Sequence, residues 1–306
     1  MGALKYKIGK FINDENYRFV YLAGKGFYNY LDDISYLKRI YKAKTGRSLD
    51  LENPTSFNEK MQWLKLYDRR PEYTVMVDKL AVKEYVAKII GREYIIPTIA
   101  EWESAEEIDW NLLPNQFVLK ATHDSGGLVI CTDKKTLNIR DAKKKLRHSL
   151  NRDYYRLYRE WPYKNVPRKI LAEEYMGNLG SAEGLTDYKL MCFNGVVRCS
   201  FTGTNRFSNY GLNVTFFDRE WQRLPFERKY PSDKNLIPKP QSYGLMIMLA
   251  EQIAHGIPFC RVDFYEINGK PYFGEVTFYP GTGLEEFSPQ SWDEELGSWI
   301  QLPKHK

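Results

Sequence analysis

Three charged side chains, Arg261, Asp263 and Glu275, lie in the stretch CRVDFYEINGKPYFGEVTFYPGTG, which is otherwise rich in aliphatic and aromatic residues. Two carboxylates on one face of a sheet, completed by phosphate oxygens and water, are a usual way to hold Mg²⁺. The alternative is an ion pair between Arg261 and Asp263 on a solvated face. We therefore consider a metal site on Asp263 and Glu275 as a hypothesis. It requires the Glu275 side chain to lie on the same face of the sheet as Asp263.

The position of Glu275 depends on the turn. Asn-Gly between alternating runs predicts a β-hairpin. A two-residue turn would put Glu275 on the face opposite Asp263, because a shift of one residue reverses every side chain. A three-residue connection over residues 268–270, with Gly269 left-handed in a G1 bulge, would bring Glu275 across from Asp263. The sequence thus predicts the longer turn if the two carboxylates work together.

A second candidate is Lys120, in the stretch FVLKATHDSGG. A lysine at the end of a strand, just before a turn of small residues, places its ammonium beside a backbone able to cradle phosphate. Ser125, Gly126 and Gly127 form that turn. Glycine pairs are common in turns, so this signal is weak by itself.

Two further stretches carry weaker signals. Lys79 follows an aspartate at the start of a predicted helix, where a lysine is ordinarily solvated. Glu173 and Glu174 lie in the apolar run ILAEEYMGN. Such a run, continuing to Met176, suits a connection between lobes whose backbone hydrogen-bonds a purine. It equally suits an edge strand with exposed carboxylates.

Composition restricts the class of protein. The chain has 306 residues, 43% of them hydrophobic and 27% charged, which is typical of a globular protein. The net charge of +6 favours anionic ligands only mildly, and a nucleic-acid binder would carry denser basic blocks. Four widely spaced cysteines in apolar runs predict buried free thiols and a reducing cytoplasm. No run approaches the roughly 20 apolar residues of a membrane span.

The predicted elements are helical at the front and rich in strands behind, which is an α+β pattern. A capping box, Ser56 with Glu59, predicts a helix start, and a single helix is expected over residues 74–90. Strands are expected over residues 117–122, 127–132, 169–176, 187–203 (a hairpin turning at Asn194-Gly195), 211–218 and 260–277, and further helices over 139–151 and 241–255.

In this order along the chain, the motifs resemble those of ATP-grasp enzymes over residues 74–284. The stretches PTSFNEKMQWLKLYD, DKLAVKEYV, LPNQFVLKATHDSGG and FGEVTFYPGTG are similar to the TupA-like ATP-grasp family of bacterial surface-polysaccharide clusters, which extends the resemblance back to about residue 50. The resemblance implies two α/β lobes clasping ATP behind an N-terminal helical extension. The expected division is a helical region at 1–73 and an ATP-grasp domain at 74–306, with a lid lobe at about 116–176 and a metal-binding lobe at about 177–306.

The resemblance also implies roles for single residues. Those expected to contact ATP are Lys79, Lys120, Ser125, Gly126, Gly127, Glu173, Glu174, Met176, Asp187 and Lys189. Arg261 and Lys189 are expected to be catalytic, and Arg261 would stabilise the charge that develops on the transferred phosphoryl group. Mg²⁺ is expected on Asp263, Glu275 and Thr277. Thr277 departs from the family, because most ATP-grasp enzymes have asparagine there, but a hydroxyl oxygen can still ligate Mg²⁺.

The implied reaction forms an amide from a carboxylate and an amine through an acyl phosphate. The implied substrates are a uronic acid, or similar carboxylate, of a polysaccharide or its precursor and an amino acid or acidic peptide. The expected location is the cytoplasm. The first 50 residues would either brace the core, which is the favoured alternative, or dock on polysaccharide assembly at the inner face of the membrane. A glycosyltransferase and a non-catalytic ATP-grasp scaffold are the alternatives, although the chain lacks the Asp-x-Asp pair typical of metal-dependent glycosyltransferases.

Overall fold

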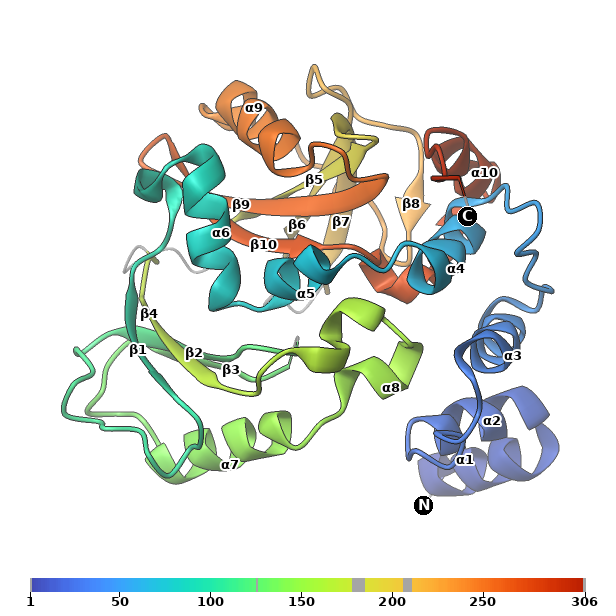
Figure 1. The fold of residues 1–306 in the computed structure, drawn as a ribbon, viewed down its shortest axis with the longest axis horizontal. Helices are drawn as coiled ribbons and strands as arrows, with labels where there is room; N and C mark the ends of the chain where they lie inside the picture. The colour runs from blue at the N-terminus through green and yellow to red at the C-terminus, as the bar shows by residue number, and fades with distance from the viewer. Residues whose placement is uncertain (1, 125, 178–184, 206–210, 305–306) are drawn as a thin grey trace.

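The computed structural model describes residues 2–124, 126–177, 185–205 and 211–304, so the predicted role of Ser125 lies outside the described residues. Two main β-sheets and the helices packed on them form the α+β fold that the sequence predicts (Figure 1). The helices are α1 (Gly2–Asn13), α2 (Glu15–Ala23), α3 (Asp33–Thr45), α4 (Phe57–Tyr67), α5 (Pro71–Val77), α6 (Ala81–Ile90), α7 (Ile139–Leu150), α8 (Tyr154–Tyr158), α9 (Tyr243–Ile253) and α10 (Ser291–Ser298), with short 3₁₀ turns η1 (Arg92–Tyr94), η2 (Trp161–Asn165) and η3 (Pro280–Gly283). The strands are β1 (Thr98–Trp102), β2 (Phe117–Ala121), β3 (Leu128–Cys131), β4 (Ile170–Glu174), β5 (Asp187–Phe193), β6 (Val196–Thr204), β7 (Asn213–Phe217), β8 (Glu227–Arg228), β9 (Phe259–Ile267), β10 (Lys270–Thr277) and β11 (Phe287–Ser288).

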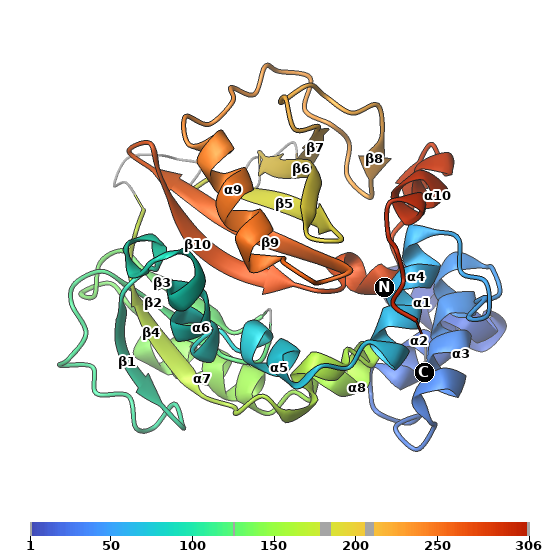
Figure 2. The ribbon, with the colours of Figure 1, turned by 45° about the horizontal axis from the view of Figure 1, so that its top comes forward.

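The larger sheet is antiparallel with the strand order β10-β9-β5-β6-β7. Because side chains alternate along a strand, its two faces differ. One face is apolar, with Leu190, Val262 and Phe264 fully buried, and α9 packs on it (Figure 2). The other face carries Lys189 and Asp263, which lie opposite each other on β5 and β9. The sheet therefore has one core face and one charged face.

The smaller sheet has the order β1-β4-β2-β3 and is also antiparallel. Phe117, Leu119 and Val129 alternate toward α7 and form a core with Leu146 of that helix. Helix α7 covers the side of this sheet that faces away from the larger one (Figure 1). The remaining side, which includes Lys120, therefore faces the larger sheet.

The hairpin of β9 and β10 corrects the predicted turn. The ladder begins directly on both sides of Asn268-Gly269, whose φ angles of 52° and 75° are those of a two-residue type I′ turn. The register shifts instead at Gly274, inside β10, and the shift brings Glu275 across from Asp263. The predicted pairing of the carboxylates is confirmed. The predicted three-residue turn is wrong, because the bulge lies in the strand.

The single helix predicted over residues 74–90 is also wrong, because α5 and α6 are separate helices. The chain leaves the helix at Asp78, whose carboxylate accepts a hydrogen bond from the Leu80 backbone N–H (2.9 Å). The backbone N–H of Lys79 donates to the Thr122 carbonyl oxygen (3.1 Å), next to the smaller sheet. An aspartate side chain that hydrogen-bonds nearby backbone N–H groups competes with helix formation. At Asp78 this local bond and the contact of Lys79 with Thr122 together end α5.

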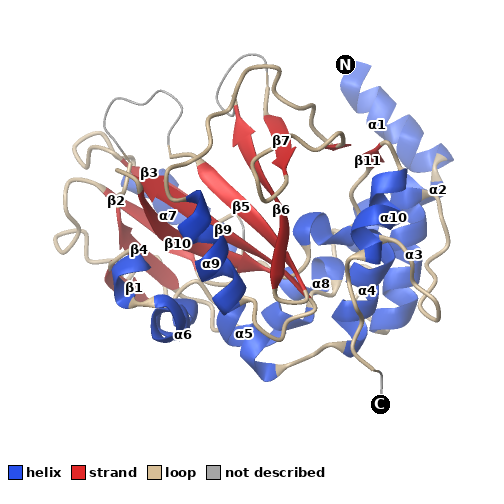
Figure 3. Cartoon of the chain, turned by 90° about the horizontal axis from the view of Figure 1, so that it is seen from above, coloured by secondary structure: helices blue, strands red, loops and turns tan. Residues whose placement is uncertain are grey.

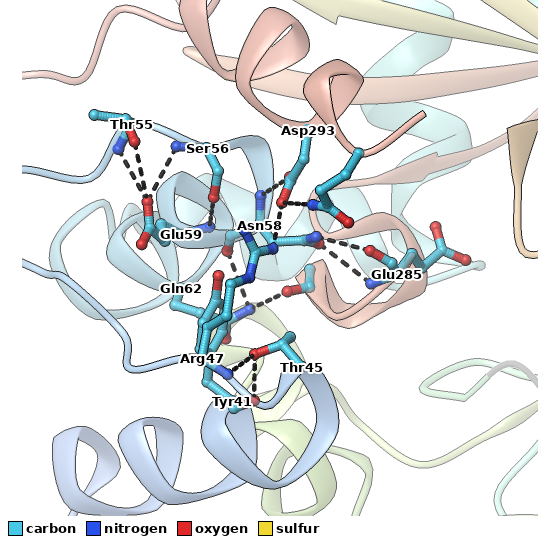
Figure 4. Close-up of polar contacts among 12 residues, drawn as sticks. Tyr41, Thr45, Arg47, Thr55, Ser56, Asn58, Glu59, Gln62, Glu285 and Asp293 are labelled. Atoms are coloured by element: carbon cyan, nitrogen blue, oxygen red, sulfur yellow. Dashed lines mark hydrogen bonds and ion pairs between the residues drawn. The ribbon is translucent and has the colours of Figure 1, made fainter. Parts of the chain in front are cut away.

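The N-terminal helices are attached to the C-terminal end of the chain, and Figure 3 shows α1 to α4 and α10 gathered at one side of the two main sheets. The Asp293 carboxylate, fully buried, binds the Arg47 guanidinium and the Asn58 backbone N–H at 3.0 Å each (Figure 4). The Asn58 side chain donates to the Glu285 carbonyl oxygen (2.8 Å). The predicted Ser56 capping box is confirmed, as are the four buried free cysteines. The predicted domain boundaries stay predictions.

Candidate active site

A cavity of about 250 Å³ lies between the two sheets and takes its lining from both. Five residues predicted to contact ATP line it: Lys120, Glu173, Glu174, Met176 and Asp187. The first four come from β2, β4 and the segment after β4, and Asp187 comes from β5. The cavity therefore brings together residues that are distant in the sequence, although their contact with ATP stays a prediction.

A charged network occupies the face of the larger sheet beside this cavity. The Arg261 guanidinium binds both oxygens of Asp263 (2.6 and 2.7 Å) and Oε1 of Glu275 (2.8 Å). The Lys189 ammonium lies 2.5 Å from Oδ2 of Asp263 and 2.6 Å from Oδ2 of Asp187. All five side chains come from alternate positions of the neighbouring strands β5, β9 and β10. The predicted catalytic residues and two of the predicted metal ligands are thus in direct contact.

These contacts keep Glu275 ionised. Burial raises the pKa of its carboxyl, but the positive charges of Arg261, Lys79 and Lys189 outweigh burial and lower that pKa to about 2. The Thr277 hydroxyl, two residues further along β10, lies 3.4 Å from Oε1 of Glu275. Glu275 is therefore a charged oxygen donor throughout the physiological pH range.

Glu173, which lines the cavity, lies between two lysines. The residue is 5% exposed, and its carboxylate lies 2.7 Å from the Lys83 ammonium and forms a second ion pair with Lys120. Burial raises the pKa of Glu173, but Lys120 and Lys83 lower it further, so the net shift is downward. The sequence reasoning missed Lys83, although it stands four residues after Lys79 in the same motif.

Asp124 makes most of the contacts among the described loop residues, 122–124 and 126–127. One carboxylate oxygen of Asp124 accepts from the backbone N–H groups of Gly126 (3.2 Å) and Gly127 (2.9 Å), and its carbonyl oxygen accepts from the Lys79 ammonium (2.5 Å). A Cβ on Gly127 would lie 2.2 Å from the Ser149 hydroxyl oxygen, so only glycine fits there. The phosphate cradle predicted from Gly126 and Gly127 stays a prediction. The sequence reasoning missed Asp124, which organises the loop.

The smaller sheet also gives the cavity an apolar lining, in which Val118 lies opposite Glu173 and Leu128 opposite Lys120. Val118, Leu128 and Ile130 line the cavity from β2 and β3, and Leu128 and Ile130 are 39% and 53% exposed. Tyr265 of β9 faces them from the larger sheet, and alternation in RVDFYEI could have placed it with Asp263. Apolar walls suit a flat aromatic ligand. The backbone N–H of Glu174 donates to the Pro97 carbonyl oxygen (3.2 Å), so it is not available to a base.

The donor set of the charged network fits Mg²⁺. Asp263 and Glu275 offer hard carboxylate oxygens on one face, and Thr277 adds a hydroxyl oxygen beside them. Within the described ranges, no group of three or more His, Cys, Asp or Glu side chains could hold a metal. A pair of carboxylates is what Mg²⁺ uses when phosphates supply the remaining ligands. Asp263, Glu275 and Thr277 could hold Mg²⁺ in this way, and their ligation of the metal stays a prediction.

Solved structures similar to this chain are ligases of low identity. D-alanine–D-alanine ligase from Helicobacter pylori is 16% identical with a TM-score of 0.39, and the match covers 81% of this chain and 70% of that one. The ATP-bound enzyme from Bacillus anthracis is 17% identical with a TM-score of 0.37, covering 67% and 55%. The ATP-grasp ligase PsnB, complexed with its minimal precursor, Mg and ADP, is 9% identical with a TM-score of 0.37, covering 72% and 57%. This chain thus spans little more than half the length of two of them, and such weak similarities carry no argument about activity.

A family model gives the stronger result. No curated protein matches the chain. The model for TupA-like ATP-grasp matches residues 59–301, which include every described residue of the cavity and of the charged network. This chain belongs to the TupA-like ATP-grasp family.

Proposed function

We propose that this protein is an ATP- and Mg²⁺-dependent ligase that joins a carboxylate to an amine. The observation that carries the proposal is the pairing of Asp263 with Glu275, bound to Arg261 and Lys189, beside a cavity that is partly lined by apolar side chains. This arrangement suits a nucleotide with its base against the apolar side chains and its phosphates toward the charged network. Bound on Asp263, Glu275 and Thr277, Mg²⁺ would neutralise phosphate charge.

The cationic side chains position the phosphates. Lys120 lines the cavity, Lys189 is paired with Asp187 of the lining, and the Lys79 ammonium donates to the Asp124 carbonyl oxygen. Burial lowers the pKa of the Arg261 guanidinium, but Asp263 and Glu275 raise it more, so Arg261 stays protonated. A fixed positive charge here stabilises the negative charge that develops on the transferred phosphoryl group.

The proposed reaction has two steps. A carboxylate oxygen of the acceptor attacks the γ-phosphorus, the bond to the β,γ-bridging oxygen breaks, and ADP leaves. The amine nitrogen then attacks the acyl carbon, the bond from that carbon to the phosphate oxygen breaks, and inorganic phosphate leaves while the amine loses a proton. The protein supplies position and charge rather than a side-chain nucleophile. Exclusion of water by the two lobes protects the acyl phosphate.

The proposed substrates follow from the family resemblance. They are a uronic acid or similar carboxylate of a bacterial surface polysaccharide or its precursor, and an amino acid or acidic peptide. The 23 tyrosines and the net charge of +6 are compatible with an acidic sugar, because sugars stack on aromatic rings and acids favour positive surfaces.

Peripheral binding to the inner face of the cell membrane is the proposed location. Helix α1 has no acidic residue and exposes Tyr6, Ile8 and Ile12 beside Lys7 and Lys10. Apolar side chains among lysines are typical of helices that lie on anionic lipid surfaces. Among the described residues, no helix is long and apolar enough to cross a bilayer.

The test is a turnover assay with Mg-ATP, candidate uronic acids and amino acids. We expect ADP, phosphate and an amide, and we expect Asp263→Asn and Glu275→Gln each to reduce ADP formation at least about a hundredfold. Glu220→Gln, an exposed carboxylate on a turn, is the matched control and should behave as wild type. Intact turnover in both site variants would overturn the metal assignment.

The same assay separates the alternatives. A glycosyltransferase would release a nucleoside diphosphate from a sugar donor without consuming ATP. A non-catalytic scaffold would bind Mg-ATP and form no ADP with any acceptor.

A further inference from the structure

A second cavity, of about 550 Å³, lies outside the proposed ATP site. One wall is the segment at residues 23–29, after α2, and the other is the end of α7 and the start of α8. Its charged lining residues are Arg152, Asp153 and Arg156, and His148 lies beside them. The volume is ample for a sugar or a larger substrate fragment.

Partly buried contacts join α8 to the N-terminal helices beside the cavity. The Tyr155 hydroxyl of α8 donates to the Asp33 carboxylate of α3 (2.7 and 2.9 Å), and the Arg159 guanidinium lies 3.3 Å from the same carboxylate. The Tyr36 hydroxyl donates to the Leu157 carbonyl oxygen (2.8 Å). Arg159 is 2% exposed. The cavity is therefore a built feature of the interface between the N-terminal helices and α8.

The charge of the cavity is positive. Arg156 is paired with Asp153 at 3.1 Å, so those two side chains largely cancel. Arg152 is half-buried, and no ion pair involves it within the part of the chain that the structure describes. A half-buried guanidinium without a carboxylate partner is suited to an anionic ligand.

Arg152 also connects this cavity to the loop at residues 122–127. A Cβ built on Gly126 would lie 3.1 Å from Nη1 of Arg152, and the His123 ring nitrogen lies 3.2 Å from the Arg152 carbonyl oxygen. On the same loop, the carbonyl oxygen of Asp124 accepts from the Lys79 ammonium. A ligand held by Arg152 therefore lies one loop away from the proposed phosphate site.

We propose that this cavity is an anion-binding subsite for the acceptor, holding a phosphate or carboxylate group of the acidic carbohydrate while its reacting carboxylate reaches the ATP site. This inference rests on the proposed ligase function for the identity of the ligand. It assigns the N-terminal helices a role in substrate binding, because residues 23–29 supply one wall.

The test is calorimetric titration of the full chain saturated with Mg-ADP. One arm uses inorganic pyrophosphate and the other uses trigalacturonate, so the arms distinguish a phosphate from a carboxylate. We expect at least one probe to bind, and Arg152→Gln to weaken that binding at least about tenfold through loss of charge-assisted hydrogen bonds. Asn29→Asp, which adds a negative charge on the opposite wall, should weaken it as well.

The matched control is Arg147→Gln, which removes the same charge from an exposed position of α7. It should change the affinity less than twofold. The subsite is refuted if neither probe binds the wild-type protein at millimolar concentration, or if Arg152→Gln and Asn29→Asp both bind like the control. If binding depends on Arg152 but no acceptor yields ADP, the subsite stands and the ligase proposal fails.

Discussion

Replacing Gly274 by alanine tests whether the bulge in β10 positions the proposed metal ligands. A Cβ at this position would lie 3.1 Å from a ring carbon of Tyr265 and 3.2 Å from the Asp263 carbonyl oxygen. Carbon atoms normally rest about 3.5–4.0 Å apart, so the added methyl group requires a displacement of about 0.5 Å. Both obstructing atoms belong to β9, so the displacement falls on the strand that carries Asp263.

The size of the effect follows from that displacement. A misplacement of about 1 Å in an active site can cost about a hundredfold in rate, so half of it predicts a loss of about tenfold in ADP formation by Gly274→Ala. Overpacking should also cost about 1–3 kcal/mol of unfolding free energy. A second measurement needs no acceptor: Mg²⁺ should increase the melting-temperature gain from ADP less in the variant than in the wild-type protein.

Gly244→Ala is the control, because no atom lies within 4 Å of the Cβ it would add on α9. It should keep wild-type turnover and wild-type Mg²⁺ dependence. The reasoning is refuted if Gly274→Ala also keeps both, because the bulge would then have no part in placing Asp263 against Glu275.

Three further predictions concern other parts of the chain. Lys83→Met should lower the free energy of unfolding, measured with urea, by about 3–5 kcal/mol, because buried Glu173 loses one of its two lysines. Burial raises the pKa of Glu160 from 4.5 to about 7 despite Lys65, so the folded protein should lose stability as pH rises from about 4.5 to 7, and Glu160→Gln should remove that slope in urea titrations at pH 5 and 7. Ile12→Ser should reduce the fraction of protein that floats with phosphatidylglycerol vesicles, whereas phosphatidylcholine vesicles should float little of either form.

Features with a local cause could be predicted from the sequence. The Ser56 capping box and the hairpin turn at Asn194-Gly195 each depend on a few consecutive residues, and both are present. The strands β2 to β7, β9 and β10 and the helix α7 follow from periodicity in the same way, whereas β1, β8 and β11 were not predicted. These signals sufficed for the α+β class.

Features set by tertiary contacts could not be predicted. The break between α5 and α6 depends on the Lys79 N–H reaching Thr122, some forty residues away in the chain. The ion pairs of Glu173 likewise need α6 and two strands to meet. Helix propensity depends on neighbouring residues and carries no information about such distant contacts. It therefore predicts one continuous helix over residues 74–90.

The hairpin shows how a correct pairing can follow from a wrong turn. The Asn-Gly pair prefers the two-residue turn that it forms, and the requirement that Glu275 meet Asp263 then had to be satisfied elsewhere. A glycine inside a strand often marks a bulge, and Gly274 was that signal in the sequence. The predicted pairing of Glu275 with Asp263 was correct, whereas the predicted turn was wrong.

The net charge around Asp263 and Glu275 favours a role for these carboxylates in metal binding, because it does not repel an anionic nucleotide. The network and its neighbours comprise Asp187, Asp263, Glu275, Glu173, Lys79, Lys83, Lys120, Lys189 and Arg261. Four of these nine side chains are negative and five are positive, so the group as a whole is slightly cationic. Mg-ATP is anionic, and a cationic site favours it even though two carboxylates face the cation. Asp263→Asn and Glu275→Gln should therefore weaken the Mg²⁺ dependence of ADP binding more than they weaken binding of ADP alone.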